Sequence, residues 1–370
     1  MRCGHAAAPD WRRAARLALE RLRPVPDGAN LGFVYFSDHF GPYAGALLEY
    51  FRRETGIADW VGTVGMGVLA TGVEYLDQPA VAVMAARLPG DGFRVFSGKS
   101  RAPSLHERTS TGQPASHFAV VHGDPGTPDI PELVSDMALK LDSGMLVGGL
   151  ACARSDPVLI ANEVLRGGLS GVVLSGDVRV HTGVTQGCVP VKSGAGWRTH
   201  RITACDGSVI ATLDGRPALD VFAEDIGPAA AADLRLAARV YLAGFPAEGG
   251  ERDFVARNIV GMDARQRLLA VGAALEEGMS LMFCRRDEES AREDLAAMLA
   301  ALHDDLPGPP LGGLYVSCIA RGANMFGEPG VEMDMIRREL GDFPVVGFLA
   351  NGEIARDRLY GYTGVLTVFV

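Results

Sequence analysis

The chain has little positive charge and no long hydrophobic run. Its 35 Lys and Arg residues face 45 Asp and Glu residues, which gives a formal net charge of −10. Such an acidic field repels nucleic acid and anionic lipid, and no run of Lys or Arg offsets it. The longest apolar stretch, Met145 to Ala153, is nine residues long, about half of what a membrane-spanning helix needs. These absences argue against nucleic-acid binding and membrane insertion.

Closely spaced metal ligands are also scarce. The six cysteines and eight histidines form no Cys-x-x-Cys motif, and the closest pairing is Cys3 with His5 in an N-terminal tail that we expect to be mobile. We therefore predict no metal site. The N-terminus lacks an apolar signal core, so we expect a cytoplasmic protein whose cysteines are thiols. Within residues 1–29 we predict one amphipathic helix, Trp11 to Leu22, with Asp10 as its N-cap.

An internal similarity recurs three times along the 370 residues. Each copy has a first strand, a polar loop, a helix, a second strand that ends in an apolar-Val-Gly signature, and a final strand. The first strands are predicted at Leu31–Phe36, Phe118–Val121 and Leu314–Ser317, the helices at Tyr43–Glu54, Pro131–Leu141 and Val331–Leu340, and the shared glycines are Gly62, Gly148 and Gly347. We interpret this pattern as a duplicated strand-helix-strand unit.

A β-rich stretch separates copies two and three. It alternates apolar and polar residues over several short runs, and Asp206-Gly207 predicts a tight hairpin turn. Many strands with few long helices argue against a Rossmann sheet or a (β/α)8 barrel, which need strict alternation. We predict a layered α/β fold with mixed sheets and internally repeated strand-helix-strand units. The predicted domain boundary falls in the Ala-rich segment around Gly227-Pro228.

The C-terminal motifs resemble a known family. The run Tyr315-Val316-Ser317-Cys318-Ile319-Ala320-Arg321-Gly322, followed by Met325-Phe326-Gly327 and by Gly347 to Ile354, is similar to the FIST C-terminal domain (F-box and intracellular signal transduction). The N-terminal partner domain is indicated by Gly62 to Gly67, Gly183 to Pro190 and Leu213 to Leu219. The resemblance covers about Leu31 to Phe369. We accordingly predict an N-terminal helix in 1–29, a FIST N-terminal domain in 30–225 and a FIST C-terminal domain in 226–370.

The resemblance implies a sensory domain for a small ligand in intracellular signal transduction. Some relatives of this family are haem-binding nitric-oxide sensors. The chain leaves no residues for a fused output domain, so signalling would pass to a separate protein partner, and homodimerisation is the common default. No catalytic residue set accompanies the family, and no phosphate loop or nucleophile elbow in the sequence has the required spacing. An enzyme is therefore not the expectation.

Polar residues that follow the predicted strands are the candidate ligand-binding residues. In an open α/β sheet, ligands gather at the carboxyl ends of the strands. There Arg321 can hold a carboxylate with its fork of donors, while Asn351 offers both a donor and an acceptor. The full candidate set is Arg321, Asn351, Glu353, Gln186, Asp38, Cys318 and Cys188. The favoured ligand is a small polar metabolite, with an amino acid as one possibility.

Two alternatives stay open from the sequence. A haem needs only one axial ligand, so spacing does not exclude a gas sensor, and the candidate ligands are His39, His122 and His181. Cys318 with nearby Arg321 also permits a cysteine-dependent enzyme, because a cation lowers a thiol pKa. Histidine and cysteine are also common as structural residues at strand ends and in protein cores, which argues against both alternatives.

Overall fold

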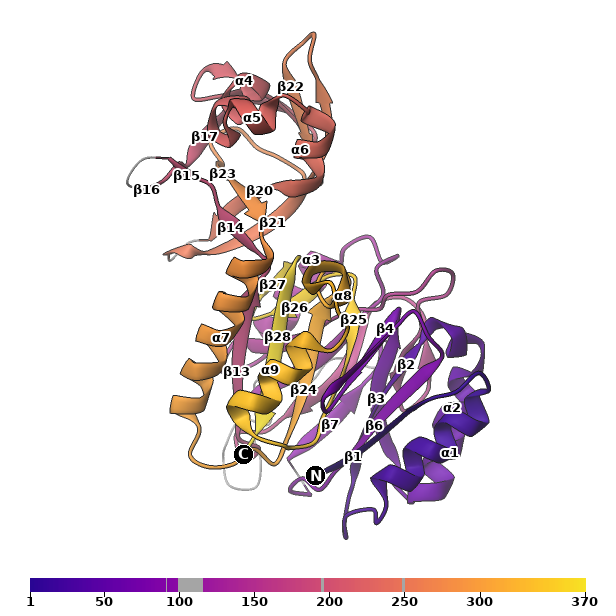
Figure 1. The fold of residues 1–370 in the computed structure, drawn as a ribbon. Helices are drawn as coiled ribbons and strands as arrows, with labels where there is room; N and C mark the ends of the chain where they lie inside the picture. Colours follow the sequence, from indigo (N-terminus) through magenta and orange to yellow (C-terminus); the bar gives the residue numbers. More distant parts are fainter. Residues whose placement is uncertain (91, 99–115, 194–195, 248–249) are drawn as a thin grey trace. The chain divides into compact units, whose positions relative to one another are not determined.

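The chain forms two compact units. We describe it from a computed structural model that covers residues 1–90, 92–98, 116–193, 196–247 and 250–370 (Figure 1). Unit 1 comprises Met1–Thr185 and Glu293–Val370, and unit 2 comprises Gln186–Arg292. The predicted division at 225/226 lies inside unit 2, at the last residue of α4 (Ala218–Ile226), and does not coincide with a boundary between the compact units. No described helix is long and apolar enough to cross a membrane.

The described residues of unit 1 form three six-stranded sheets. Sheet A has the order β1 (Arg2–Ala7), β6 (Ala80–Ala86), β2 (Leu31–Ser37), β3 (Asp59–Gly65), β10 (Leu159–Ala161) and β11 (Val164–Leu165). Sheet B has the order β13 (Val180–Gln186), β28 (Thr363–Phe369), β24 (Gly312–Cys318), β25 (Val345–Ala350), β4 (Gly67–Ala70) and β5 (Val73–Leu76). Sheet C has the order β27 (Arg358–Tyr360), β26 (Glu353–Ala355), β9 (Met145–Leu150), β8 (Phe118–Gly123), β12 (Leu169–Leu174) and β7 (Phe93–Phe96).

The strand pairing confirms the three predicted repeats. In each repeat the first and second strands are parallel, and the final strand pairs antiparallel with the first: β2–β3 with β6, β8–β9 with β12, and β24–β25 with β28. The same steric constraint explains the shared glycine in each repeat. A Cβ at Gly62, Gly148 or Gly347 would collide with a carbonyl oxygen of the first strand beside it, so only glycine allows this close approach.

Each repeat also contributes a hairpin to another repeat's sheet. The β4–β5 hairpin of repeat 1 pairs with β25 in sheet B. The β10–β11 hairpin of repeat 2 pairs with β3 in sheet A, and the β26–β27 hairpin of repeat 3 pairs with β9 in sheet C. This cyclic exchange ties the three sheets together in a threefold pattern of connections. It also brings segments that are far apart in the sequence onto one sheet.

Buried rings join the three sheets. Tyr35 of β2, His122 of β8 and Phe348 of β25 come from sheets A, C and B, respectively. The Tyr35 hydroxyl lies 3.1 Å from His122 Nε2, and the Tyr35 ring stacks on Phe348 with 5.2 Å between centroids. Burial lowers the pKa of His122 to about 3, so its imidazole is neutral at physiological pH. The junction is thus a packed core with one internal polar pair.

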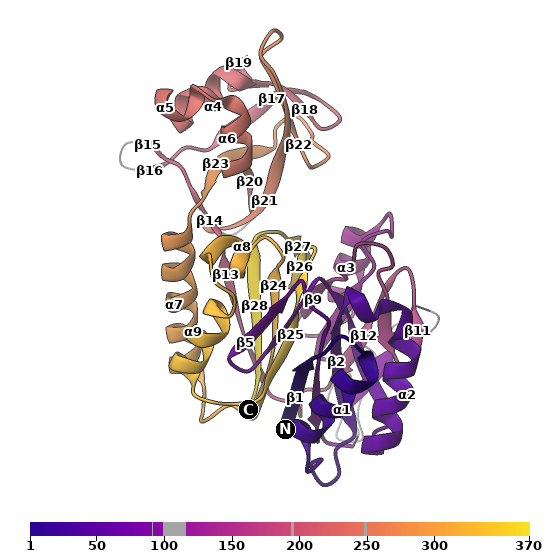
Figure 2. The same ribbon diagram turned by 45° about the vertical axis from the view of Figure 1, so that its right-hand side comes forward.

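Helices cover the outer faces of the sheets. α1 (Trp11–Leu22) and α2 (Ala44–Thr55) lie beside sheet A (Figure 2), while α7 (Glu288–Asp305) and α9 (Val331–Leu340) pack on sheet B (Figure 1). The remaining helices of unit 1 are η1 (Asp38–Tyr43), α3 (Ile130–Ala138) and α8 (Ala323–Phe326). The predicted helix and its Asp10 cap are confirmed, since the Asp10 carboxylate accepts a bond from Arg13 N at 3.1 Å.

The segment before α1 differs from the prediction of a mobile tail. It forms strand β1, which pairs antiparallel with β6 from Arg2 opposite Ala85 to Ala7 opposite Ala80. The backbone hydrogen bonds of an open sheet edge supply the energy that fixes it. Residues 1–29 therefore contribute a strand as well as a helix to the core of unit 1.

Unit 2 is an antiparallel sheet that closes on itself, because β23 pairs with β17 and also with β20. The strands of this sheet are β14 (Cys188–Pro190), β17 (His200–Asp206), β18 (Val209–Leu213), β19 (Arg216–Pro217), β20 (Tyr241–Ala247), β21 (Gly250–Asp263), β22 (Leu268–Val271) and β23 (Ser280–Arg286), while β15 (Lys192–Ser193) and β16 (Gly196–Trp197) pair with each other in a separate hairpin. The helices of unit 2 are α4 (Ala218–Ile226), α5 (Pro228–Ala231) and α6 (Leu234–Val240). The predicted hairpin at Asp206-Gly207 joins β17 to β18.

The core of unit 2 forms around Phe222 of α4 and Phe283 of β23, whose ring centroids lie 4.8 Å apart.

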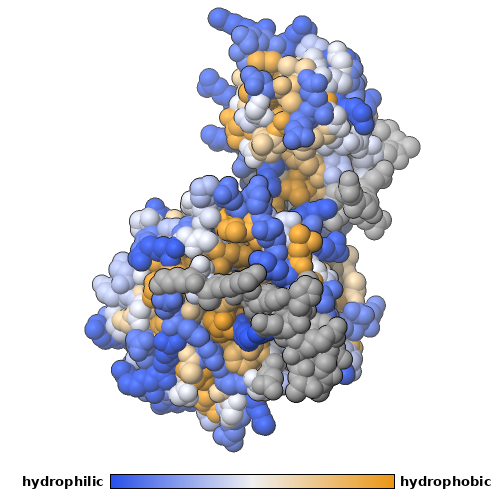
Figure 3. All heavy atoms as spheres, turned by 180° about the vertical axis from the view of Figure 1, so that it is seen from behind, coloured by the Kyte–Doolittle hydropathy of each residue, from blue (hydrophilic) through white to orange (hydrophobic). Residues whose placement is uncertain are grey.

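On the face of the molecule shown in Figure 3, hydrophobic residues lie in small groups among hydrophilic ones. Scattered exposure of this kind is usual for a folded protein.

Candidate functional site

The carboxyl end of β24 brings together three of the predicted site residues. β24 and β25 are parallel, with Cys318 opposite Ala350, so both strands end at the same edge of sheet B. Arg321 follows β24 by three residues, and Glu353 opens β26 just after β25. Cys318, Arg321 and Glu353 are all buried. Polar groups therefore gather at this edge as the parallel-sheet rule predicts.

Arg321 is held by a carboxylate that the sequence analysis did not single out. Its guanidinium is fully buried and donates from Nε to Glu332 Oε1 at 2.9 Å, with Nη2 at 2.8 Å from the same oxygen. Glu332 lies in the first turn of α9. It also accepts bonds from the Tyr315 hydroxyl at 2.6 Å and from the Ser317 hydroxyl at 2.9 Å. Arg321 thus belongs to an internal polar network.

One edge of the Arg321 guanidinium has no hydrogen-bond partner. Among the described residues, nothing accepts a bond from the buried Nη1. The guanidinium carbon lies 5.6 Å from the centroid of the Phe326 ring, a cation–π distance. A buried donor without a partner costs about 1–3 kcal/mol. This edge is therefore available to a further acceptor.

Glu353 also has an atom without a partner. Its Oε2 accepts bonds from the Thr363 hydroxyl at 2.8 Å and from the Thr363 backbone N–H at 3.1 Å. Its Oε1 is buried and has no hydrogen-bond partner in the described part of the chain. Burial raises the pKa of Glu353 to about 7, although Thr363, Cys318 and Arg321 all act to lower it. The carboxyl group therefore changes its charge near physiological pH.

The Cys318 thiol lies next to Glu353. Burial, followed by the neighbouring Glu353 carboxylate, raises the pKa of the Cys318 thiol above its ordinary value. A nucleophilic or redox-sensing cysteine needs a lowered pKa and access to solvent. Cys318 is only 7% exposed, so it has the properties of a packed, protonated side chain.

Arg321 lies in a glycine-rich loop at residues 319–330, and one carboxylate from another repeat holds this loop. Glu74 of β5 accepts bonds from Ala323 N at 3.1 Å and from Gly330 N at 2.8 Å. Gly322 and Gly330 both have positive φ, and a Cβ on Gly322 would collide with the Glu74 carboxylate. Burial raises the pKa of Glu74, against the two backbone bonds that lower it. The hairpin of repeat 1 therefore holds the loop of repeat 3 in place.

The remaining candidate residues lie elsewhere. Asn351 follows β25, but its side chain is exposed. Asp38, at the end of β2 in sheet A, pairs with Arg154 at 2.9 Å. Gln186 and Cys188 belong to unit 2. There Gln186 Nε2 donates to the carbonyl of Phe254 at 3.5 Å, and Cys188 is buried beside Cys284, whose thiol pKa it helps to raise.

The three candidate haem ligands do not form one site. His122 is fully buried and packs against Tyr35 and Phe348 with centroids 5.5 and 5.9 Å away, so a porphyrin would have to displace both rings. His39 Nδ1 lies 3.4 Å from Asp38 Oδ1, and His181 Nδ1 lies 2.9 Å from Asp305 Oδ2. Among the described residues, no group of three or more His, Cys, Asp and Glu side chains is arranged to hold a metal ion.

Glu332, Glu74 and Thr363 are the polar residues that sequence reasoning missed. Glu332 falls in the first turn of a predicted helix, where an acidic residue interacts favourably with the helix dipole. That position does not indicate that Glu332 pairs with a buried arginine. Glu74 is 256 residues away from Gly330 in the sequence. Only the exchanged hairpin brings them together, and no local pattern signals it.

Comparison with known proteins agrees with the resemblance seen in the motifs. The chain matches the FIST N domain over residues 30–216 and the FIST C domain over residues 218–356. It is 30% identical over 383 residues to an uncharacterized protein of Mycobacterium tuberculosis (strain ATCC 25618 / H37Rv), with 99% of this chain and 98% of the relative covered. It is 29% identical over 387 residues to an uncharacterized protein of Mycobacterium bovis (strain ATCC BAA-935 / AF2122/97), with the same coverage. The chain therefore belongs to the FIST family, whose domains are sensory domains of signal transduction.

Proposed function

We propose that this FIST protein senses a small polar metabolite, an α-amino acid in the first instance, at the carboxyl end of β24 and signals to a separate partner protein. One observation carries the proposal. Arg321 Nη1 and Glu353 Oε1 are a buried donor and a buried acceptor that lack partners at the same strand edge. Each group also acts electrostatically on the pKa of the other, which supports a shared site.

The two free atoms are complementary to a zwitterion. A guanidinium edge binds a carboxylate through charge-assisted hydrogen bonds. A carboxylate accepts bonds from an ammonium group, and an added positive charge would hold Glu353 in its ionised form. An α-amino acid carries both groups on one carbon, its Cα. Binding would offset the cost of leaving both atoms unpaired in the free protein.

The loop at residues 319–330 supplies the conformational step. Arg321 lies in this loop and is fully buried, so binding at its free edge would require the loop to shift, against the bonds from Ala323 N and Gly330 N to Glu74. A ligand that binds the open and the closed loop with different affinity shifts the balance between them. That shift is the change which a partner protein would detect.

The two alternatives from the sequence have less support. The raised thiol pKa of Cys318 and its burial weigh against a cysteine-dependent enzyme. The packing of His122 weighs against haem at that residue. His39 and His181 stay as candidates for haem, and a Soret band after haem loading that disappears in one histidine variant would support them.

Native mass spectrometry of the freshly purified protein is the first test. An added mass in the range of an amino acid, retained under gentle ionisation, would support the proposal. A haem-sized adduct would contradict it in favour of the gas sensor. The bare protein is then screened against the proteinogenic amino acids by thermal shift, because a ligand that binds only the folded state raises the melting temperature.

Site variants assign the response to this edge. Glu353→Gln should strongly reduce the thermal shift, because a neutral amide lacks the negative charge that attracts the ligand ammonium. Arg154→Ala, which alters an ion pair at the end of sheet A, should keep it. If Glu353→Gln responds as strongly as the parent protein, or if no amino acid shifts the parent, the proposed site is wrong.

A further inference from the structure

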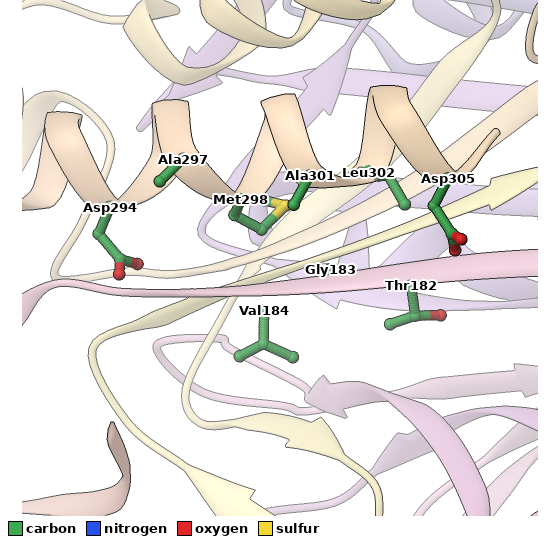
Figure 4. A pocket seen from close by; sticks show the side chains of 9 residues that line it. All are labelled: Thr182, Gly183, Val184, Asp294, Ala297, Met298, Ala301, Leu302 and Asp305. Carbon is green, nitrogen blue, oxygen red and sulfur yellow. The ribbon is translucent and has the colours of Figure 1, made fainter. Parts of the chain in front are cut away.

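A groove runs along the edge strand of sheet B, and its lining shares no residue with the proposed ligand site. It has a volume of about 560 Å³ and lies between β13 and α7 (Figure 4). Thr182, Gly183 and Val184 form the strand side, and the helix side includes Met298 and the exposed Ala297 and Ala301. A Cβ on Gly183 would collide with Met298. The helix therefore lies close to the strand backbone at the middle of the groove.

The strand that borders the groove has an open edge. In the described part of the chain β13 is the last strand of sheet B, and no strand pairs with its outer side. Val184 is 37% exposed on it. An edge strand presents unpaired backbone N–H and C=O groups, which form a template for one more strand. An extended peptide can bind there through main-chain hydrogen bonds.

Two carboxylates mark the ends of the groove. Asp294 accepts a bond from the Thr185 hydroxyl at 2.7 Å, and Asp305 lies 2.9 Å from His181. Asp294 and Asp305 are both exposed, and Figure 4 shows them at opposite ends of the groove. Eleven residues of helix separate them, which corresponds to about 16 Å. Five residues of extended chain also cover about 16 Å.

We infer that this groove binds an extended segment of a partner protein, about five residues long with basic residues at both ends, which adds to β13 as the next strand of sheet B. The backbone of the segment would pair with β13. Its basic ends would lie near Asp294 and Asp305, and a small apolar residue in the middle would face Ala297, Ala301 and Met298.

A second copy of this chain suits the groove less well. Helix α7 carries six carboxylates and one arginine, so pairing β13 with β13 of another copy would bring two acidic helices towards each other. The strand itself offers His181 and otherwise only neutral side chains. Charge complementarity therefore favours a basic partner segment over self-association.

The test uses the full chain and three synthetic peptides observed by NMR. The probe is acetyl-Arg-Thr-Val-Thr-Arg-amide. An acidic peptide with Glu at both ends reverses the charge, and acetyl-Arg-Thr-Pro-Thr-Arg-amide keeps the charge but interrupts strand pairing, because proline lacks the N–H donor. We expect the probe at millimolar concentration to shift the backbone amide signals of Val180–Gln186 and Ala297–Asp305. The two control peptides should not.

Matched variants on α7 separate groove binding from general attraction. Ala301→Arg places a cation in the groove and should weaken probe binding by about tenfold, a loss of about 1.4 kcal/mol. Ala300→Arg adds the same charge on an exposed helix position outside the groove lining and should have a much smaller effect. Likewise, Asp305→Asn should weaken binding by roughly two- to fivefold, and Asp304→Asn by less.

Three results would overturn the inference. The first is an absence of amide shifts with the probe, and the second is equal binding of the proline peptide, which would mean attraction by charge alone. The third is a concentration-dependent dimer that Val184→Lys abolishes, which would assign the edge to a second copy. None of these results bears on amino-acid binding at Arg321 and Glu353, so the two proposals can fail separately.

Discussion

The carboxyl ends of β2 and β24 occupy the same place in two repeats, yet their arginines have opposite surroundings. At the end of β2, Asp38 and Asp77 pair with Arg154 from the segment after β9; the Arg154 side chain is 48% exposed, whereas that of Asp38 is 8% exposed. At the end of β24, Arg321 pairs with Glu332 and is fully buried. Both ends contain an arginine–carboxylate pair, but only at β24 is the arginine shielded from water. Burial, not pairing, distinguishes the candidate site from its counterpart.

The energetic consequence follows from solvation. An exposed ion pair gains little because water screens it and solvates each charge when the pair breaks. In a buried pair, removal of one member leaves the other charge without solvent or partner. Removing one member of the ion pair should therefore cost more free energy of unfolding at the β24 end than at the β2 end. The largest expected effects of mutation lie at the β24 end.

Arg321→Ala should have the largest effect on stability. It leaves Glu332 buried with only neutral donors, so we expect the free energy of unfolding to fall by about 3–5 kcal/mol. Urea unfolding followed by circular dichroism measures it. The double variant Arg321→Met, Glu332→Gln removes both charges and should lose less than the single variant. A loss below about 1 kcal/mol for Arg321→Ala would mean that the buried pair is not structural.

Glu353 should make the stability depend on pH. Its pKa is about 7 in the folded protein and 4.5 is its usual value, so the folded state binds the proton more tightly than the unfolded state. This contribution is fully present below pH 4.5 and is lost as the pH rises through 7. The loss amounts to at most about 3 kcal/mol. Unfolding of the parent and of Glu353→Gln across this range tests it.

The test compares how the free energy of unfolding changes with pH in the parent protein and in Glu353→Gln. Glu353→Gln removes the titrating group, so its stability should vary less between pH 4.5 and pH 7 than that of the parent. Parallel curves for the two proteins would place the titration elsewhere in the chain.

Arg154→Ala should have the smallest effect. Its guanidinium is half-exposed, so water and salt reach the charge that pairs with Asp77 and with the less exposed Asp38. We expect a urea midpoint close to that of the parent protein, with any difference vanishing at high salt. A large, salt-independent loss would remove the contrast between the two strand ends.

Local patterns predicted most of the repeated architecture. The apolar-Val-Gly signature located the second strand of each repeat, and the helix predicted at Val331–Leu340 coincides with α9. Hydrophobic periodicity and turn residues act within a few positions of the chain, so a single sequence carries them. The N-terminal strand was missed because the pairing of Arg2–Ala7 depends on an edge formed by residues 80–86.

For the candidate site, the sequence determined which residue types follow each strand and that they gather at the carboxyl edge. It identified Arg321, Glu353 and Cys318 on this basis, and the motifs around them also indicate the family. Only the tertiary structure decided which of the candidates are buried together, that Glu332 and Glu74 complete the network, and that Gln186 and Cys188 belong to unit 2. The physical reason is that burial depends on packing across the whole unit, and that the Glu74 contacts depend on an exchanged hairpin that joins segments about 250 residues apart.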